Sequence, residues 1–514
     1  MKKNIKTNLL TVSTGVLATL LVGGVVAYGP TALSYTNVAT QARGLARTGG
    51  DAPAAITVQP RAIAFVCPPA ITVPPGLDSV AAATSSIYAP PSASHLAVVG
   101  AGSTTDLYKL GTPAPLDVQA RLVAKAAVET PLVALVTPDK DADLQVAGLT
   151  VSRARGGELA GLAVGSCVAP AAEQWLVGGS TELLHTAKLT ISNPSQQAAS
   201  VKIDIFGALG EIPTGSRGVI ALAAGESVAL QLEALAPEQT RLAVRVQATG
   251  ALVTSSIQTT ALDGLHPLGI SHLDPMAAPV RDLNFVGVIS SGEAIDEGTA
   301  PTLRLLSPNG DATATISVFG PKGEVRLRGG ESVELGAGRV HDVSLGGLPA
   351  GQYAVVLSAN QPLVGAVRMT PTSTAVESTA EAGDVPAPAE PKPKFGETWL
   401  VPSMLASSTS LVVPPDLAAD IVLTGLGSGG TAQVSVTGKQ AQELKLEPNK
   451  VQTVRLDAAT EARVVTVTAP HDTIGWSAIL RDPANSALTA ALTPSAALPA
   501  PGQVKVRQVP VTAG

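Results

Sequence analysis

The chain has 514 residues, of which 45% are hydrophobic, 14% charged and 3% aromatic, and its formal net charge at pH 7 is -6. This length predicts about three to four domains. Beyond the N-terminus the densest basic group, Lys322, Arg326 and Arg328, is interrupted by Glu324. A nucleic-acid-binding protein needs a basic stripe to displace counterions from phosphates, so this composition argues against nucleic acid as a partner.

The N-terminal segment predicts export. Lys2, Lys3 and Lys6 precede an uncharged, mainly apolar run over residues 7–27. Positive charge stays on the cytoplasmic side, and about 20 apolar residues are enough to span a bilayer. We therefore expect residues 1–30 to be a transmembrane anchor or a signal segment, with cleavage after Ala27 or Ser34 as the alternative that would make the protein secreted.

The next segments are a tether and a β-rich domain. Residues 31–58 are predicted to be a membrane-proximal tether, and residues 59–172 a distinct domain. Strand-like runs occur in that domain, whereas residues 118–128 fit either a short helix or a strand. Its two cysteines, Cys67 and Cys167, are the only ones in the chain. In an oxidising compartment they predict one disulfide; two free buried thiols are the alternative.

Three similar blocks follow the β-rich domain. They begin at residues 174–178, 284–288 and 398–401, and the later landmarks recur at offsets of roughly 105 to 118 residues, the size of a sandwich domain. Apolar residues alternate with polar ones, as in Val201, Ile203 and Ile205, which predicts half-buried antiparallel strands. The predicted class is all-β, with tandem immunoglobulin-like β-sandwich domains. The expected boundaries are 173–270, 281–370 and 396–484 for repeats 1 to 3, 371–395 for a Pro/Ala-rich acidic linker, and 485–514 for a tail that ends in a possible last strand.

The chain contains motifs that resemble functional sites without their structural context. Residues 425–430 match G-x-G-x-x-G, but a strand-like run follows instead of a helix, which predicts a hairpin turn. Asp139, Asp141 and Asp143 lack the glycine and glutamate of a calcium loop, so a polar turn is the preferred interpretation. His266, His272 and Asp274 form a mild cluster that we assign to a loop. The sequence therefore predicts no catalytic residue, no metal site and no cofactor.

Tryptophans are the remaining candidates for a ligand surface. Trp175 and Trp399 head repeat blocks, which favours a role as core anchors. A sugar-binding platform would need exposed aromatic rings, and we would look for it around Trp175 or Trp476.

Several motifs carry a family resemblance. They are the runs at residues 175–180, 189–194 and 261–269, the cysteine followed by two prolines at 67–69, and Cys167 ahead of Trp175. Together with the N-terminal segment, they resemble an actinobacterial family of membrane-anchored envelope proteins of unknown function. The resemblance implies an exported, membrane-associated protein with no assigned activity or site residues. Members are often encoded beside a large membrane glycosyltransferase, which implies cell-envelope glycan work.

These observations lead to two hypotheses. The first is a non-catalytic structural or interaction protein: a membrane-tethered rod of β-sandwiches outside the cytoplasm, partnered by the membrane and by an envelope protein or polysaccharide. The second is a glycan-binding accessory to an envelope glycosyltransferase. We do not expect an enzyme.

Overall fold

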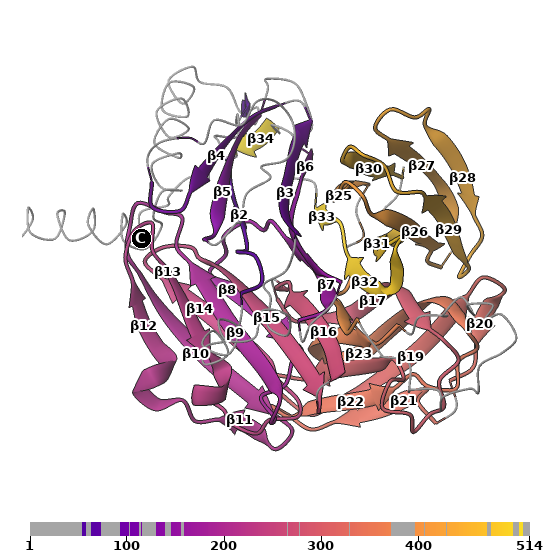
Figure 1. Cartoon of the computed structure of the whole chain (residues 1–514), viewed down its shortest axis with the longest axis horizontal. Helices are drawn as coiled ribbons and strands as arrows, with labels where there is room; N and C mark the ends of the chain where they lie inside the picture. The colour runs from indigo at the N-terminus through magenta and orange to yellow at the C-terminus, as the bar shows by residue number, and fades with distance from the viewer. Residues whose placement is uncertain are drawn as a thin grey trace, which may run out of the picture.

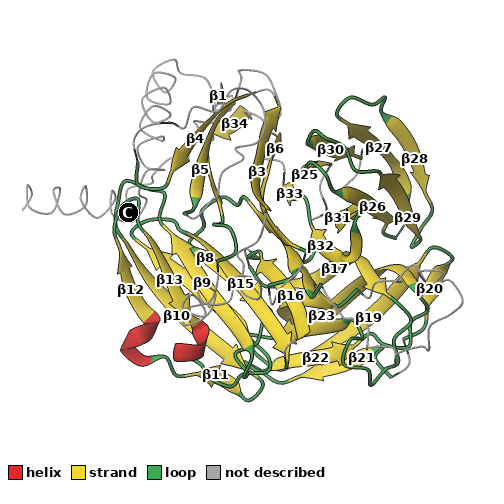
Figure 2. Cartoon of the chain, in the orientation of Figure 1, coloured by secondary structure: helices red, strands yellow, loops and turns green. Residues whose placement is uncertain are grey.

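The computed structural model describes residues 54–57, 63–72, 93–101, 103–112, 115, 130–138, 145–155, 159–264, 266–276, 278–327, 329–371, 396–403, 405, 407–427, 429–469, 474–496 and 503–506. More than half of the described residues lie in strands, which confirms the all-β prediction. The helical part of these ranges consists of two short turns, η2 (Gly215–Gly218) and η3 (Leu232–Ala234) (Figure 2). Neither is long and apolar enough to cross a bilayer. The predicted anchor, residues 1–30, lies outside the described residues.

The N-terminal module (residues 63–168) consists of two three-stranded antiparallel sheets, with strand orders β2-β5-β4 and β3-β6-β7. The predicted disulfide is present: Cys67, at the end of one sheet, is bonded to Cys167, just after the last strand of the other. Residues 118–128 lie outside the described ranges. The strands are β2 (Ile63–Cys67), β3 (Ala93–Ala101), β4 (Ser103–Lys109), β5 (Leu132–Pro138), β6 (Gln145–Ala154) and β7 (Gly161–Ser166).

Module 1 (residues 173–273) has two antiparallel sheets that share one hydrophobic cluster. One sheet has the order β11-β10-β14-β8, with β12 also paired to β10; the other has the order β13-β9-β15-β16. Val201, Ile203 and Ile205 are fully buried, as the alternation predicts. The strands are β8 (Glu173–Val177), β9 (His185–Ser192), β10 (Ala199–Gly207), β11 (Gly210–Ile212), β12 (Val219–Leu222), β13 (Ser227–Gln231), β14 (Ala243–Thr249), β15 (Thr254–Asp263) and β16 (His266–Leu273).

Modules 2 (residues 280–400) and 3 (residues 408–496) repeat this strand order. In module 2 one long strand, β23, contributes its first half to one sheet and its second half to the other. The immunoglobulin-like class of the three modules stays a prediction. The strands of module 2 are β17 (Val280–Ser290), β18 (Thr302–Leu306), β19 (Ala312–Gly320), β20 (Gly323–Val325), β21 (Ser332–Leu335), β22 (Val340–Ser344), β23 (Gly351–Met369) and β24 (Thr398–Leu400). Those of module 3 are β25 (Ser408–Val413), β26 (Ala418–Gly425), β27 (Gly430–Val436), β28 (Gln442–Leu446), β29 (Val451–Leu456), β30 (Arg463–Thr468), β31 (Ile474–Asp482), β32 (Asn485–Leu492) and β33 (Ser495–Ala496).

The predicted start of repeat 3 is wrong. Trp399 lies on β24, which pairs with the end of β23 and so closes module 2, in the position that β16 holds in module 1. The strand that corresponds to β8 is β25, which pairs with β30. Both Trp175 and Trp399 donate their indole N–H to a glutamate two residues earlier, Glu173 and Glu397. The same Glu-x-Trp motif therefore lies on the first strand of module 1 and on the last strand of module 2. Aligning the repeats on this motif gives the wrong start for repeat 3.

The predicted linker and tail are also corrected. The Pro/Ala-rich stretch 371–395 does not separate two modules, because Met369 before it and Thr398 after it are partners in one antiparallel ladder. Residues 372–395 themselves lie outside the described ranges. The predicted tail supplies β32 and β33 to module 3, because β31 and β32 form a hairpin beyond the expected boundary at residue 484. The last strand, β34 (Gln503–Val506), pairs with β1 (Ala54–Thr57).

Consecutive strands at the start of each module lie in opposite sheets and are not hairpins. In module 3, β26 belongs to the sheet of β29 and β31, whereas β27 belongs to the sheet of β28 and β30. The glycine-rich run 425–430 therefore crosses from one sheet to the other, which corrects the predicted hairpin turn. Gly425 and Gly429 approach each other so closely that a Cβ on Gly425 would lie 2.7 Å from the Gly429 Cα. This close approach is the physical reason for glycine there.

The modules do not form an extended rod. In each module one sheet ends in an edge strand, and these four strands, β7, β16, β24 and β32, pack against one another in a closed circuit. Figure 1 labels three of them, β7, β16 and β32, which lie close together near the centre of the molecule. The backbones approach closely: a Cβ on Gly161 of β7 would lie 2.7 Å from the backbone nitrogen of Ile270 on β16. Glu397, just before β24, donates its N–H to the Leu268 carbonyl at 2.8 Å. An exposed edge strand invites pairing with other chains, and this arrangement covers all four.

Candidate functional site

Trp175 and Trp476 do not form a ligand surface. Both rings are 1% exposed, so the predicted sugar platform around them is wrong. Trp175 stacks on Phe206 with ring centroids 5.7 Å apart, and the Arg245 guanidinium lies 5.3 Å from its centroid. Trp476 donates its indole N–H to the Thr409 hydroxyl at 2.6 Å. Both tryptophans are core anchors, because a large ring whose N–H has a buried partner contributes most to packing.

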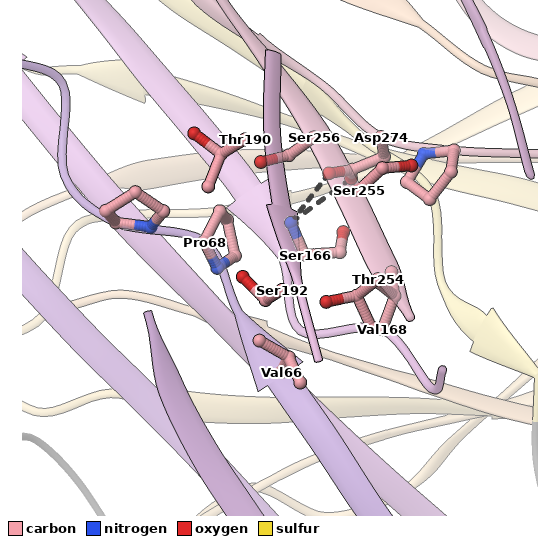
Figure 3. A pocket seen from close by; sticks show the side chains of 12 residues that line it. Val66, Pro68, Ser166, Val168, Thr190, Ser192, Thr254, Ser255, Ser256 and Asp274 are labelled. Atoms are coloured by element: carbon pink, nitrogen blue, oxygen red, sulfur yellow. Dashed lines mark hydrogen bonds between the residues drawn. The ribbon is translucent and has the colours of Figure 1, made fainter. Parts of the chain in front are cut away.

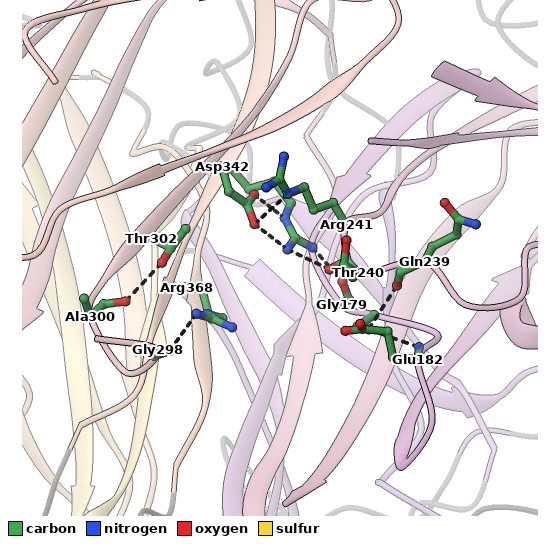
Figure 4. A network of polar contacts seen from close by, with 12 residues as sticks. Gly179, Glu182, Gln239, Thr240, Arg241, Gly298, Ala300, Thr302, Asp342 and Arg368 are labelled. Carbon is green, nitrogen blue, oxygen red and sulfur yellow. Dashed lines mark hydrogen bonds and ion pairs between the residues drawn. The ribbon is translucent and has the colours of Figure 1, made fainter. Parts of the chain in front are cut away.

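A buried arginine joins modules 1 and 2, and its partners Gly179, Thr240 and Asp342 are labelled in Figure 4. Arg304, on β18, is 3% exposed. It donates to the Gly179 carbonyl at 2.6 Å and the Thr240 carbonyl at 3.1 Å, both in module 1. It also pairs with Asp342 on β22 at 2.8 Å, and its guanidinium lies 5.0 Å from the centroid of the Trp399 ring. The two hydrogen bonds to Gly179 and Thr240 depend on the modules being packed together, whereas Asp342 and Trp399 belong to module 2 and hold the guanidinium in place.

Buried ion pairs and hydrogen bonds also hold the other junctions. Between the N-terminal module and module 3, the fully buried Asp482 accepts from Arg155 at 2.7 Å. The hydrogen bond to Arg155 and the nearby Arg153 lower the pKa of Asp482, although its burial acts in the opposite direction as the largest single effect. Between modules 2 and 3, Ser477 donates its hydroxyl to the Val286 carbonyl at 2.5 Å.

A small recess lies between the N-terminal module and module 1 (Figure 3). Its cavity has a volume of ≈ 10 Å³, about the space of one water molecule. Hydroxyl groups of β9 and β15 form one wall, and Pro68 and Ser166 come from the N-terminal module. Asp274, which follows β16, completes the lining and accepts the Ser166 backbone N–H at 3.0 and 3.2 Å.

Two titratable groups at this junction are strongly perturbed. Burial raises the pKa of Asp274 to about 6, and the Ser166 donor only partly offsets this. Burial, with a smaller effect from Lys188, lowers the pKa of His272 to about 3, so that the imidazole is neutral. Neither ring nitrogen of His272 has a hydrogen-bond partner among the residues that the structure describes. The ring packs against β7, where a Cβ on Gly165 would lie 3.0 Å from its Cγ.

The chain can now be compared with known proteins. The model of a family described as "Family of unknown function (DUF5719)" matches residues 122–447. The chain belongs to this family. The predicted membership of a family of unknown function is thus confirmed, whereas actinobacterial origin and membrane anchoring stay predictions. The matched range begins within the N-terminal module and ends after β28 of module 3, so it includes modules 1 and 2 and part of the other two, and is longer than a single repeat.

Other comparisons add little. No curated protein matches the chain. Among solved structures it is similar to "Biofilm associated protein - BSP domain", with 10% identity and a TM-score of 0.12, over 79% of this chain and 91% of that one. It is also similar to the pilus adhesin SpaC from Lactobacillus rhamnosus GG, with 8% identity and a TM-score of 0.10, over 77% of this chain and half, 50%, of that one. At these TM-scores neither similarity carries an argument about fold or function.

In this DUF5719 protein the mild cluster noted in the sequence does not lie on a loop, which corrects the prediction: His266 and His272 lie on β16, and Asp274 follows it. His272 and Asp274 both face the N-terminal module, whereas the side chain of His266 and residues 139–144 lie outside the described set. Within that set, no group of three or more His, Cys, Asp or Glu side chains is placed to hold a metal ion. Sequence reasoning missed the recess because its hydroxyls come from β9 and β15, far from Asp274 in the chain. Thr254 and Ser256 are two residues apart on one strand, so their hydroxyls lie on the same face, and this spacing is the feature of the sequence that could have indicated a polar recess.

Proposed function

We propose that this protein is a non-catalytic structural or interaction protein of the cell envelope, anchored in the membrane by residues 1–30 and exposed outside the cytoplasm. The observation that carries this proposal is the closed packing of the four modules through their edge strands. A body built this way holds its outer surfaces in fixed relative positions, as a scaffold requires. The immunoglobulin-like class of the modules belongs to the same proposal, supported by the crossing of consecutive strands between two sheets.

The disulfide supports an extracytoplasmic location. The Cys67–Cys167 bond closes a loop with a sequence separation of 100 residues. Disulfides persist in oxidising compartments and are rare in the reducing cytosol. This agrees with the basic residues that precede the apolar N-terminal run, since positive charge is retained on the cytoplasmic side.

The two ends of the described chain lie on one side of the molecule. β1 and β34 pair with each other, and Figure 1 places them opposite β11 and β22. With an anchor before β1, the outer parts of modules 1 and 2 face away from the membrane. We call the loops of module 1 on that side, which carry Leu183 and Leu209, the distal loops.

The distal loops carry the most exposed large apolar side chains in the described residues. Leu183 is 88% exposed and Leu209 is 94% exposed. Their loops meet around Gln239, whose carbonyl accepts the Thr181 N–H at 2.9 Å and whose side chain lies against Gly207. Exposed apolar loop tips are favourable anchors for a protein partner. We therefore propose that the distal loops contact an envelope protein.

The test uses the full chain, expressed in its native membrane and purified after chemical cross-linking. The Leu183→Ser/Leu209→Ser double variant is compared with wild type. Leu252→Ser is the matched control, because Leu252 is also exposed but lies beyond the opposite end of β10. We expect one cross-linked envelope protein to be recovered with wild type and the control, and to decrease at least several-fold with the double variant. Equal recovery with all three, or no cross-linked partner, contradicts a role for the distal loops.

The glycan-binding alternative required exposed aromatic rings at Trp175 or Trp476. Trp175 and Trp476 are buried, and the recess beside Asp274 has room for about one water and not for a sugar ring. No other observation on the described residues favours it, so we do not propose it.

A further inference from the structure

The recess between the N-terminal module and module 1 differs from the other junctions in its charge. Asp274 lies there without a basic partner: within the described ranges, no Lys, Arg or His side chain forms an ion pair with it. Lys188, on the neighbouring β9, makes its hydrogen bond to the Thr72 hydroxyl and reduces the pKa of His272, but does not reach Asp274. Within the described ranges the donors to the carboxylate come from Ser166 and are uncharged; its backbone N–H is shared between the two oxygens.

Four aspartates in the other junctions and cores, three buried and Asp342 partly buried, are each paired with arginine. The distances are 2.6 Å for Asp204 with Arg245, 2.8 Å for Asp342 with Arg304, 2.6 Å for Asp420 with Arg481, and 2.7 Å for Asp482 with Arg155. A buried charge without a partner is costly, and the fold avoids this cost at these four positions. Beside Asp274 the described residues supply no such positive charge.

The wall opposite Asp274 offers oxygen atoms with unused lone pairs. Thr190 on β9 lies directly across from Ser256 on β15 in the strand register. Thr254, two residues before Ser256, faces the same recess. No described protein group forms a hydrogen bond with any of these three hydroxyls, although each of the three residues is at least nine-tenths buried. Hydroxyl oxygens and one carboxylate together form a hard, oxygen-only environment with a single negative charge.

We propose that this recess binds one monovalent cation of about the size of Na⁺, held by the Asp274 carboxylate and the hydroxyls of Thr190, Thr254 and Ser256. The cavity of ≈ 10 Å³ holds about one water-sized particle, which matches the ion and is too small for choline. The single carboxylate balances one positive charge, and hard cations prefer oxygen ligands. At mildly alkaline pH the carboxyl is ionised, because its pKa of about 6 is exceeded. The bound ion would lock the N-terminal module onto module 1.

The test measures the melting temperature of the full chain in detergent at mildly alkaline pH. NaCl is compared with choline chloride at equal ionic strength, so that general screening cancels. We expect NaCl to raise the melting temperature of wild type by about 2 °C, because an ion that binds only the folded state stabilises it. The Asp274→Asn variant, which retains an acceptor for the Ser166 N–H, should lose this difference between the two salts.

Two further variants make the result specific. Asp482→Asn removes a carboxylate that already has Arg155 as a partner, so it should lower stability in both salts and keep the full sodium effect. Thr190→Val keeps the shape of the side chain, removes one hydroxyl and should reduce the sodium effect; it also decides the question if Asp274→Asn does not fold. A sodium effect that is absent from wild type, or undiminished in Asp274→Asn or Thr190→Val, overturns the proposal. Sodium NMR linewidths, broadened by wild type and not by Asp274→Asn, provide the direct measurement.

Discussion

Replacement of Arg304 by alanine tests the packing of modules 1 and 2 directly. The guanidinium is buried, and it joins β18 and β22 of module 2 to two backbone carbonyls of module 1. Alanine leaves the carbonyls of Gly179 and Thr240 without their donor and Asp342 without its closest partner. It also removes the cation from the face of the Trp399 ring.

The size of the effect follows from these contacts. Breaking one partner of a buried ion pair costs about 3–5 kcal/mol, because the remaining charge is left uncompensated. Here Asp342 is 20% exposed in its side chain and keeps Arg241 at 3.5 Å, which reduces that penalty. Two unsatisfied carbonyls add about 1 kcal/mol or more each. We therefore expect Arg304→Ala to lower the free energy of unfolding by about 4 kcal/mol.

The assay is equilibrium unfolding in urea, followed by tryptophan fluorescence, with Arg326→Ala as the matched control. Arg326 also pairs with a carboxylate, Glu331, at 2.8 Å, but its side chain is 85% exposed, so its loss should not change stability measurably. Because Trp399 lies under the Arg304 guanidinium, its emission should also change in the folded state. If Arg304→Ala unfolds at the same urea concentration as Arg326→Ala, the closed packing of the modules is not what stabilises this protein.

Three further outcomes are expected. Cys67→Ser should lower the free energy of unfolding by about 4–5 kcal/mol, the chain-entropy value for a loop of about 100 residues, and a reducing agent should then have no additional effect on the urea midpoint. Gly396→Ala should lower the free energy of unfolding by more than about 2 kcal/mol, because φ is 104° and a Cβ would overlap the Ala487 carbonyl oxygen. The control Gly338→Ala, with φ 68° and nothing within 4 Å of the new atom, should lower it by about 1 kcal/mol. Equal losses would contradict the close approach of β24 and β32. In choline chloride the pKa of Asp274 is about 6 in the folded state and 3.8 in the unfolded state, so unfolding releases a proton between these pH values. The free energy of unfolding should therefore fall as pH rises from about 4 to about 6. A series of urea titrations should show this slope for wild type and not for Asp274→Asn.

The four-module arrangement changes how the Pro/Ala-rich stretch of this protein is understood. The Pro/Ala-rich stretch 371–395 has the composition of a spacer, and a spacer would place modules 2 and 3 at a distance from each other. The stretch instead connects β23 to β24 within module 2, while Val286 of module 2 and Ile479 of module 3 share one hydrophobic cluster. The composition of a segment therefore does not show what it connects.

The recess beside Asp274 illustrates a similar limit for site prediction. His272 and Asp274 were noticed as neighbours in the sequence, and the structure does place both at one junction. Asp274 is unusual because it has no arginine partner among the described residues. The sequence could not show this, because the arginine partner of each of the other aspartates comes from another strand. Asp204 and Arg245, for example, are cross-strand partners on β10 and β14.

The sequence by itself determined the local features of this protein. Period-two alternation placed strands such as β10 and β19, and the two cysteines left one possible disulfide. These signals are local or combinatorial: the side-chain period of a strand is fixed by its backbone, and two cysteines allow a single pairing. Exposure, strand partners and module contacts were decided only by the tertiary structure. Trp175 and Trp399 share one local motif yet lie on β8 and β24, because pairing between strands depends on which edge is free, and no stretch of sequence carries that information alone.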